Sequence, residues 1–173
     1  AEVGTTGSDD LTIKVSADGS TWMDALRVDG GSGHVTGAAV MASATDTTAG
    51  RLMRADYGYG PGNLVGSVAE AAGVPTGAVI ETGSTVDGSY TRFADGTQIC
   101  AQSLTTIGTG VTTWSFPIAF SVAPSCVASV EASVPRFTTT GASSATQIDV
   151  DCWDITGTRQ AETAQLLAFG RWF

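Results

Sequence analysis

The sequence predicts an all-β protein, and three observations indicate this class. Strand-length runs alternate apolar and polar residues, β-branched residues are frequent, and Gly, present 22 times, recurs between the runs. The dipeptide Asp-Gly, a strong hairpin-turn signal, recurs along the chain, for example at 18–19, 87–88 and 95–96. Because β-branched side chains fit a pleated sheet and Gly permits tight turns, we expect short antiparallel strands joined by hairpins.

The first predicted part, residues 1–43, is a β-hairpin module. Apolar and polar residues alternate over 11–15 and again over 26–28, on either side of the turn at 18–19. This pattern predicts a small meander with one apolar face. A meander of this size buries too little apolar surface to be stable alone. We therefore interpret it as a module that needs neighbours, and copies of the same chain in an oligomer are the neighbours we expect.

Residues 44–83 form the second predicted part, a connector or collar rich in Ala, Gly and Thr. Within it, residues 63–72 are compatible with a short helix that has Asn63 as its N-cap. Gly66 lies in the middle of this segment and weakens the helix prediction. We expect this part to join two modules and not to form an independent domain.

Residues 84–173 form the third predicted part, an antiparallel β-sandwich of about six strands. Strand-like runs recur here with turn signals between them. These runs cover residues 90–93, 98–105, 112–116, 126–134, 148–155 and 166–173. Trp114 and Phe116 alternate within one run, so we expect both in the core.

The net charge of −9 restricts the possible partners. An acidic surface repels phosphate backbones and anionic lipids, so we expect neither nucleic acid nor a membrane surface as a partner. No apolar run approaches the ~20 residues that span a bilayer, so membrane insertion is not expected either. We also expect no signal peptide, and a start at Ala1 is compatible with a piece of a longer chain.

The sequence offers little catalytic or metal-binding chemistry. Cys100, Cys126 and Cys152 lie too far apart for a metal-binding pair, and we interpret them as reduced thiols buried in strands. The single His34 lies in a Gly-rich turn, and neither a nucleophile elbow nor a phosphate loop occurs. We predict a protein that is not an enzyme and uses no cofactor and no metal. A glycan-cleaving pair of carboxylates stays an alternative, because 17 acidic residues make some pair inevitable.

The run at 148–155 holds the residues that we predict to bind a ligand. Its even-numbered positions from 148 to 152 are apolar and expected in the core, so Asp149, Asp151 and Trp153 face the other way. An indole ring can stack on the apolar face of a sugar, and carboxylates accept hydrogen bonds from its hydroxyls. The alternative is that Trp153 packs against a neighbouring subunit. Asp154 points to the opposite face, and its spacing from the other two acids is not that of a calcium loop.

The last residues of the chain form the predicted oligomer interface. Phe169, Arg171 and Phe173 occupy one face of the final strand, with Trp172 on the other. This segment is unusually apolar for a terminus, and burial at a threefold interface explains it. We expect Arg171 to pair with an acid across that interface.

Four stretches resemble tail proteins of bacterial viruses. DDLTIKVSADGSTWMDALRVDGGSGHVTG at 9–37 resembles a shaft module of tail proteins from alphaproteobacterial phages and prophages. The C-terminal domain of phage tail-fibre proteins is similar to GSYTRFADGTQIC at 88–100, TTWSFPIAFSVAPS at 112–125 and LLAFGRWF at 166–173. The fold implied by this resemblance is a small β-sandwich similar to the H-type lectins, usually trimeric.

The resemblance implies a distal tail-fibre protein of the virion, assembled in the host cytoplasm. Its expected role is attachment to the host surface by non-catalytic recognition of a glycan. The implied partners are itself as a homotrimer, other phage tail proteins and the host cell-surface glycan. One alternative is a purely structural tail component involved in virion assembly. An enzyme that degrades surface polysaccharide is a less favoured alternative.

Overall fold

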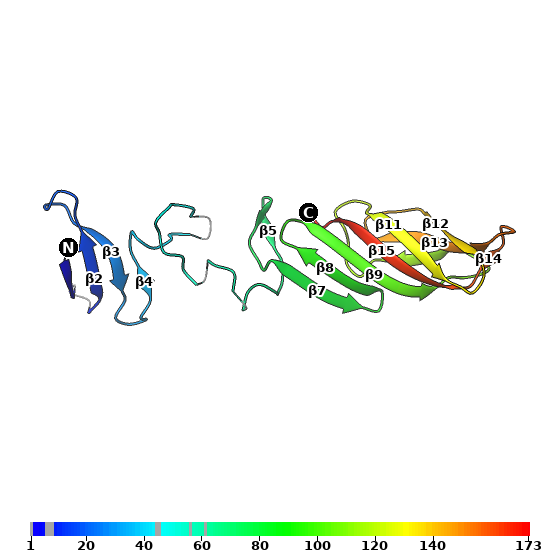
Figure 1. The fold of residues 1–173 in the computed structure, drawn as a ribbon, viewed down its shortest axis with the longest axis horizontal. Coiled ribbons are helices and arrows are strands. Elements are labelled where there is room, and N and C mark those ends of the chain that lie inside the picture. The colour runs from blue at the N-terminus through cyan, green and yellow to red at the C-terminus, as the bar shows by residue number, and fades with distance from the viewer. Residues whose placement is uncertain (1, 6–8, 44–45, 56, 61) are drawn as a thin grey trace. The chain divides into compact units, whose positions relative to one another are not determined.

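The computed structural model describes residues 2–5, 9–43, 46–55, 57–60 and 62–173, and these residues form strands and loops only (Figure 1). The predicted all-β class is therefore confirmed. Within the same ranges there is no helix long and apolar enough to cross a membrane. The chain divides into two compact units, Ala1–Gly60 and Pro61–Phe173. The predicted boundaries near 43 and 83 stay predictions, and residues 44 and 45 lie outside the described ranges.

The first unit contains a four-stranded antiparallel sheet whose strands follow one another in chain order. Its strands are β1 (Glu2–Thr5), β2 (Leu11–Val15), β3 (Met23–Val28) and β4 (Val35–Thr36). The turn between β2 and β3 is closed by Asp18, whose carboxylate accepts hydrogen bonds from the backbone N–H groups of Ser20 and Thr21 at 2.8 and 2.7 Å. Gly19 in that turn has a φ of +74°, which favours glycine. The predicted hairpin thus forms where the Asp-Gly dipeptide places it.

The second unit is a sandwich of two antiparallel sheets. One sheet has the order β11-β15-β9-β8-β7, with bounds Ser125–Glu131, Thr163–Arg171, Thr97–Thr105, Gly88–Phe93 and Ile80–Thr85. The other has the order β10-β13-β12, with bounds Thr112–Ser115, Gln147–Asp154 and Arg136–Gly141, and β14 (Arg159–Gln160) also pairs with β13. A short hairpin, β5 (Glu70–Ala71) with β6 (Val74–Pro75), precedes the sandwich.

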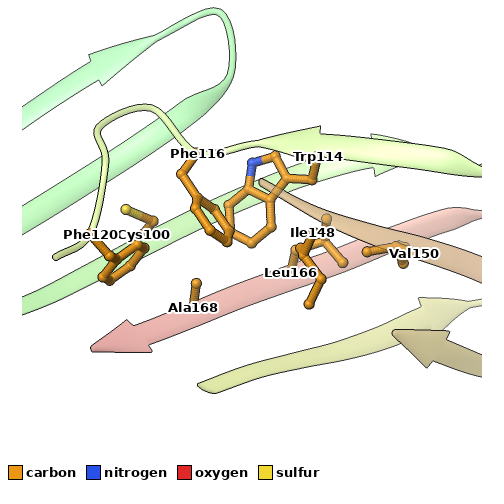
Figure 2. Close-up of a cluster of buried hydrophobic side chains, with 9 residues drawn as sticks. Cys100, Trp114, Phe116, Phe120, Ile148, Val150, Leu166 and Ala168 are labelled. Atoms are coloured by element: carbon orange, nitrogen blue, oxygen red, sulfur yellow. The ribbon is translucent and has the colours of Figure 1, made fainter. Parts of the chain in front are cut away.

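Aromatic side chains pack together between the two sheets (Figure 2). The ring of Phe116 makes edge-to-face contacts with Trp114 and Phe120, with centroids 5.0 and 5.1 Å away. The indole N–H of Trp114 donates to the carbonyl oxygen of Asp87 at 2.8 Å, so its polar atom is satisfied although the residue is buried. Smaller residues from both sheets complete the cluster: Cys100, Ile148, Val150, Ala164, Leu166 and Ala168. The expectation that Trp114 and Phe116 are core residues is confirmed.

The segment 63–72 is not a helix, so the short helix expected there was wrong. Its backbone instead bonds to the neighbouring strand β7: the N–H of Gly66 donates to the carbonyl oxygen of Ile80, and that of Val68 to the Glu81 carboxylate, both at 2.9 Å. Gly66 disfavours a helix, and pairing with a sheet edge satisfies the same backbone groups.

A pair of Phe→Ala substitutions tests the aromatic core. Phe116 is 7% exposed and contacts two other rings, whereas Phe137 is 47% exposed on an outer face. We expect Phe116→Ala to lower the free energy of unfolding by about 3–5 kcal/mol, because it removes buried surface and leaves a cavity. Phe137→Ala is the matched control and should cost less than about 1 kcal/mol. Denaturant unfolding measures both, and equal losses would contradict the assigned core.

Candidate functional site

The burial of alternate side chains of β13 determines which of its side chains point outward. Ile148, Val150 and Cys152 are buried in the core, as expected. Because side chains alternate along a strand, Asp149, Asp151 and Trp153 project from the opposite face of the sheet. We call this outer surface of β10, β12, β13 and β14 the β13 face.

Cross-strand neighbours add four side chains to the β13 face. Residues directly opposite one another on adjacent strands lie on the same side of a sheet. The register pairs Thr113 with Asp149, Thr139 with Asp151, Phe137 with Trp153, and Arg159 also with Trp153. The face therefore carries two aromatic rings, two carboxylates, a guanidinium and two hydroxyls.

Hydrogen bonds and stacking interconnect these groups. The Arg159 guanidinium donates to Asp151 Oδ2 at 3.0 Å and also lies over the Trp153 ring, 4.7 Å from its centroid. The indole N–H of Trp153 donates to Thr139 Oγ1 at 2.8 Å. Asp149 Oδ1 accepts a hydrogen bond from the Thr113 hydroxyl, also at 2.8 Å. The side chains are thus held in defined orientations before any ligand arrives.

Two atoms of the Asp151–Arg159 ion pair lack hydrogen-bond partners among the described residues. They are Asp151 Oδ1 and Arg159 Nε, one an acceptor and the other a donor, and both are buried. Buried polar atoms are nearly always paired in folded proteins, so such an exception calls for a water molecule or another polar group. The unsatisfied pair lies beside Trp153, at the centre of the β13 face.

The aromatic surface differs from the one expected from the sequence. Trp153 is half-buried, and the Arg159 guanidinium covers part of its ring. Phe137, its neighbour on β12, is 47% exposed and presents the larger open aromatic surface. Sequence reasoning missed Phe137, Thr139 and Arg159, because only the pairing of β12 and β14 with β13 brings them to this face.

Asp154 belongs to the turn that carries Arg159. Its carboxylate accepts hydrogen bonds from the hydroxyl of Thr156 at 2.7 Å and from the backbone N–H of Thr158 at 3.0 Å. These bonds lower the pKa of Asp154, with the Thr156 hydroxyl as the largest cause and the Thr158 N–H next. Gln160 donates to the other carboxylate oxygen at 2.9 Å. Asp154 therefore fixes the geometry of the turn before β14.

The predicted interface residues at the C-terminus divide into two groups. Phe169 is 55% exposed and lies on the outer face of the five-stranded sheet. Trp172 is held by its own chain: its indole N–H donates to the Phe93 carbonyl at 2.9 Å. Phe173 packs edge-to-face on Trp172 at 4.5 Å, and Arg171 donates to backbone carbonyl oxygens of the same chain.

Phe169 has apolar neighbours on the outer face of its sheet. Leu167 on the same strand and Val127 on β11, which pairs with it, are both exposed. We call Val127, Leu167 and Phe169 the apolar strip. No charged side chain occupies the outward positions of β9 at 97–105 or of β15 at 163–169. Of the predicted interface residues, Phe169 is therefore the one that presents open apolar surface.

All three cysteines are free thiols. Cys100 and Cys152 are buried in strands as expected, whereas Cys126, also in a strand, is only half-buried. Burial raises the pKa of the Cys100 thiol to about 11. In the described parts of the chain, no group of three His, Cys, Asp or Glu side chains is placed to hold a metal ion.

No family model and no curated protein matches this chain. Solved structures of pyocin tail fibres do match. An N-truncated R1-type pyocin tail fibre has a TM-score of 0.42 and 16% identity, over 53% of this chain and 84% of that one. A C-terminal piece of the R1 pyocin fibre of P. aeruginosa has a TM-score of 0.41 and 17% identity, over 53% and 28% of the two chains. A corresponding piece of the P. aeruginosa R2 pyocin fibre has a TM-score of 0.43 and 14% identity, over 94% and 52%.

A pair of threonine variants tests the turn that supports the β13 face. Thr156→Val removes the hydroxyl that contributes most to the lowered pKa of Asp154, so this pKa should rise and the carboxylate should lose its charge at a higher pH. Thr158→Val is the matched control, because it keeps the backbone N–H that bonds to Asp154. The charged Asp154 carboxylate stabilises the folded state, and this contribution is lost as the pH falls through the pKa of Asp154 in the folded protein. NMR titration of the Asp154 carboxyl measures both variants, and an unchanged pKa in Thr156→Val would refute the assignment.

Proposed function

We propose that this chain is a distal tail-fibre component of a bacterial virus that attaches the particle to a glycan on the host surface without cleaving it. The observation that carries the proposal is the β13 face, where exposed Phe137 and half-buried Trp153 lie beside Asp149, Asp151 and Arg159. The resemblance of residues 88–100, 112–125 and 166–173 to phage tail-fibre sequences supports the biological setting.

The chemistry of the β13 face suits a sugar. Ring carbons of a pyranose pack on an aromatic side chain, and its hydroxyls both donate and accept hydrogen bonds. Asp149 has a carboxylate to accept such bonds, and Arg159 has N–H groups to donate them. The unsatisfied Asp151 Oδ1 and Arg159 Nε are buried beneath this surface, and a hydroxyl is a group that can serve an acceptor and a donor together.

The non-catalytic part of the proposal is supported by the partners of the two carboxylates on the β13 face. A glycosidase needs a pair of carboxyl groups that flank the scissile bond and act on it directly. Asp151 instead accepts a hydrogen bond from Arg159 at 3.0 Å, and Asp149 accepts one from the Thr113 hydroxyl at 2.8 Å. A purely structural tail component is the second candidate, favoured if the β13 face proves inert.

The proposal includes a homotrimer. The apolar strip of Val127, Leu167 and Phe169 lies on the sheet opposite the β13 face, so association there leaves the sugar-binding surface open. Several weak sites on one particle bind a surface with far higher avidity than a single site. The alphaproteobacterial setting, an H-type-lectin-like tip, docking onto other tail proteins, and assembly in the host cytoplasm stay predictions.

Binding to host cells tests the attachment role. The purified, labelled chain should bind candidate host cells saturably, and removal of their surface polysaccharide should abolish binding. Trp153→Ala and Phe137→Ala should each weaken binding about tenfold or more, because an aromatic anchor contributes about 2 kcal/mol. Trp22→Ala is the matched control, since Trp22 is 37% exposed in the other unit.

The outcomes separate the three candidates. Binding to intact cells that survives stripping would overturn the glycan receptor. Failure to bind any strain, with the oligomer intact, would favour a structural tail component. Release of reducing sugar ends from isolated polysaccharide would show the enzyme instead.

Sedimentation tests the trimer. The wild-type chain should sediment with three times the 17.5 kDa mass of one chain. Phe169→Asp places a charge in the apolar strip and should weaken the trimer. The trimer of this variant should therefore dissociate at higher protein concentrations than that of the wild-type chain. Ile155→Asp, at an 80% exposed turn position away from the strip, is the control and should leave the mass unchanged. A monomer mass for the wild-type chain would refute the trimer.

A further inference from the structure

The dipeptide Asp-Gly lies in or beside turns of the structure at 18–19, 29–30, 87–88 and 95–96. It can undergo a reaction of its own, in which the backbone nitrogen of the glycine attacks the carboxyl group of the aspartate. Gly has no side chain to hinder this attack. The hydrogen bonds of each aspartate decide whether its carboxyl group is available, so the structure ranks the four positions.

The carboxylates of Asp18, Asp29 and Asp95 are engaged by their own turns. At Asp18 and Asp95 the closest donors are backbone N–H groups of residues just after them, at 2.7 and 2.8 Å. At Asp29 the hydroxyl and the N–H of Ser32 both donate at 2.7 Å. Bonds from these residues are the largest causes of a lowered pKa at each position. They favour the charged carboxylate and so oppose the protonated form that reacts.

Asp87 is held differently. Among the residues that the structure describes, its carboxylate has no hydrogen-bond or ion-pair partner. Val86 and Asp87 are the loop between β7 and β8, which closes where Thr85 pairs with Gly88. Val86 is 91% exposed. A hollow of about 410 Å³, lined by Thr85 and Gly88 among others, lies beside the loop and gives water access to it.

We propose that Asp87 isomerises spontaneously to isoaspartate, and that it does so faster than the aspartates of the other Asp-Gly dipeptides. The observation that carries this proposal is the contrast between its unbonded carboxylate and the bonded carboxylates of Asp18, Asp29 and Asp95. The inference goes beyond the attachment function, which does not involve this loop.

The rearrangement needs only water. The Gly88 nitrogen attacks the protonated side-chain carboxyl of Asp87, a C–N bond closes a succinimide ring, and the carboxyl hydroxyl leaves with the amide proton as water. Water then adds to one of the two ring carbonyl groups. Opening at the side-chain carbonyl restores aspartate. Opening at the main-chain carbonyl gives isoaspartate, in which Gly88 is attached through the former side chain.

Isomerisation at Asp87 also reaches the core. The main-chain carbonyl oxygen of Asp87 accepts the indole N–H of Trp114 at 2.8 Å, and Trp114 is 2% exposed. In isoaspartate this oxygen belongs to a free carboxylate, and the backbone of the loop is one carbon longer. The turn then no longer fixes the acceptor of the buried indole. This loop is therefore a place where slow chemistry on the surface loosens the interior of the sandwich.

Isotope labelling tests the proposal on the full chain. The folded protein is kept at neutral pH in water labelled with heavy oxygen, because each passage through the ring replaces a carboxyl oxygen with one from the solvent. Trypsin digestion in ordinary water puts each Asp-Gly dipeptide on a peptide of its own, and mass spectrometry measures the label. We expect Asp87 to be labelled about tenfold or more faster than Asp18, Asp29 and Asp95, because a hydrogen bond to a charged group must first break at those positions.

Three controls accompany this measurement. Asp87→Glu should abolish the label on its peptide, because glutamate closes the larger ring far more slowly. Ser32→Ala removes the hydroxyl bonded to Asp29 and should speed labelling there while leaving the other positions unchanged. In guanidinium chloride, where the turns are unfolded, all four aspartates should be labelled at similar rates.

Two results would overturn the proposal. One is labelling of Asp87 in the folded chain that is no faster than at the other Asp-Gly positions. The other is the same order of rates in the unfolded chain, which would show that local sequence and not the fold sets the reactivity.

Discussion

The packing of Trp114, Phe116 and Phe120 between the two sheets is the interaction on which the rest of the second unit depends. Once these rings and the small residues around them occupy the interior, every second side chain of the adjoining strands must point outward. The positions of Asp149, Asp151 and Trp153 follow from the burial of their neighbours in sequence. The chemistry of the outer surfaces is thus a consequence of how the interior is filled.

The outer surfaces of the sandwich differ in character. The β13 face combines opposite charges with aromatic rings, and its side chains hold each other in place. The outer positions of β9, and those of β15 from Thr163 to Phe169, carry no charged residue and include the exposed Leu167 and Phe169 instead. A surface of the first kind suits a polar ligand, whereas one of the second kind suits contact with an equally acidic copy of the chain.

Alternation within a strand was predictable from the sequence, and pairing between strands was not. The local pattern of apolar residues shows which side chains of 148–153 face the core and which face outward. The same pattern predicts the burial of Trp114 and Phe116. The strands β7 and β12 were missed because both are edge strands, and segments such as RFTTTG carry a single apolar residue. With β12 and the short β14 missing, Phe137, Thr139 and Arg159 had no predicted place beside Trp153. The expected helix at 63–72 failed because a neighbouring strand competes for its backbone groups.

The free thiols make the fold independent of the redox state of its surroundings. No covalent cross-link joins the strands of either sheet, so moving between reducing and oxidising media makes and breaks no bond. Because the thiolate is the reactive species, a Cys100 pKa of about 11 keeps this sulfur almost unreactive towards oxidants at neutral pH. The sandwich can therefore form with or without an oxidant, because no strand pairing waits for a disulfide to close.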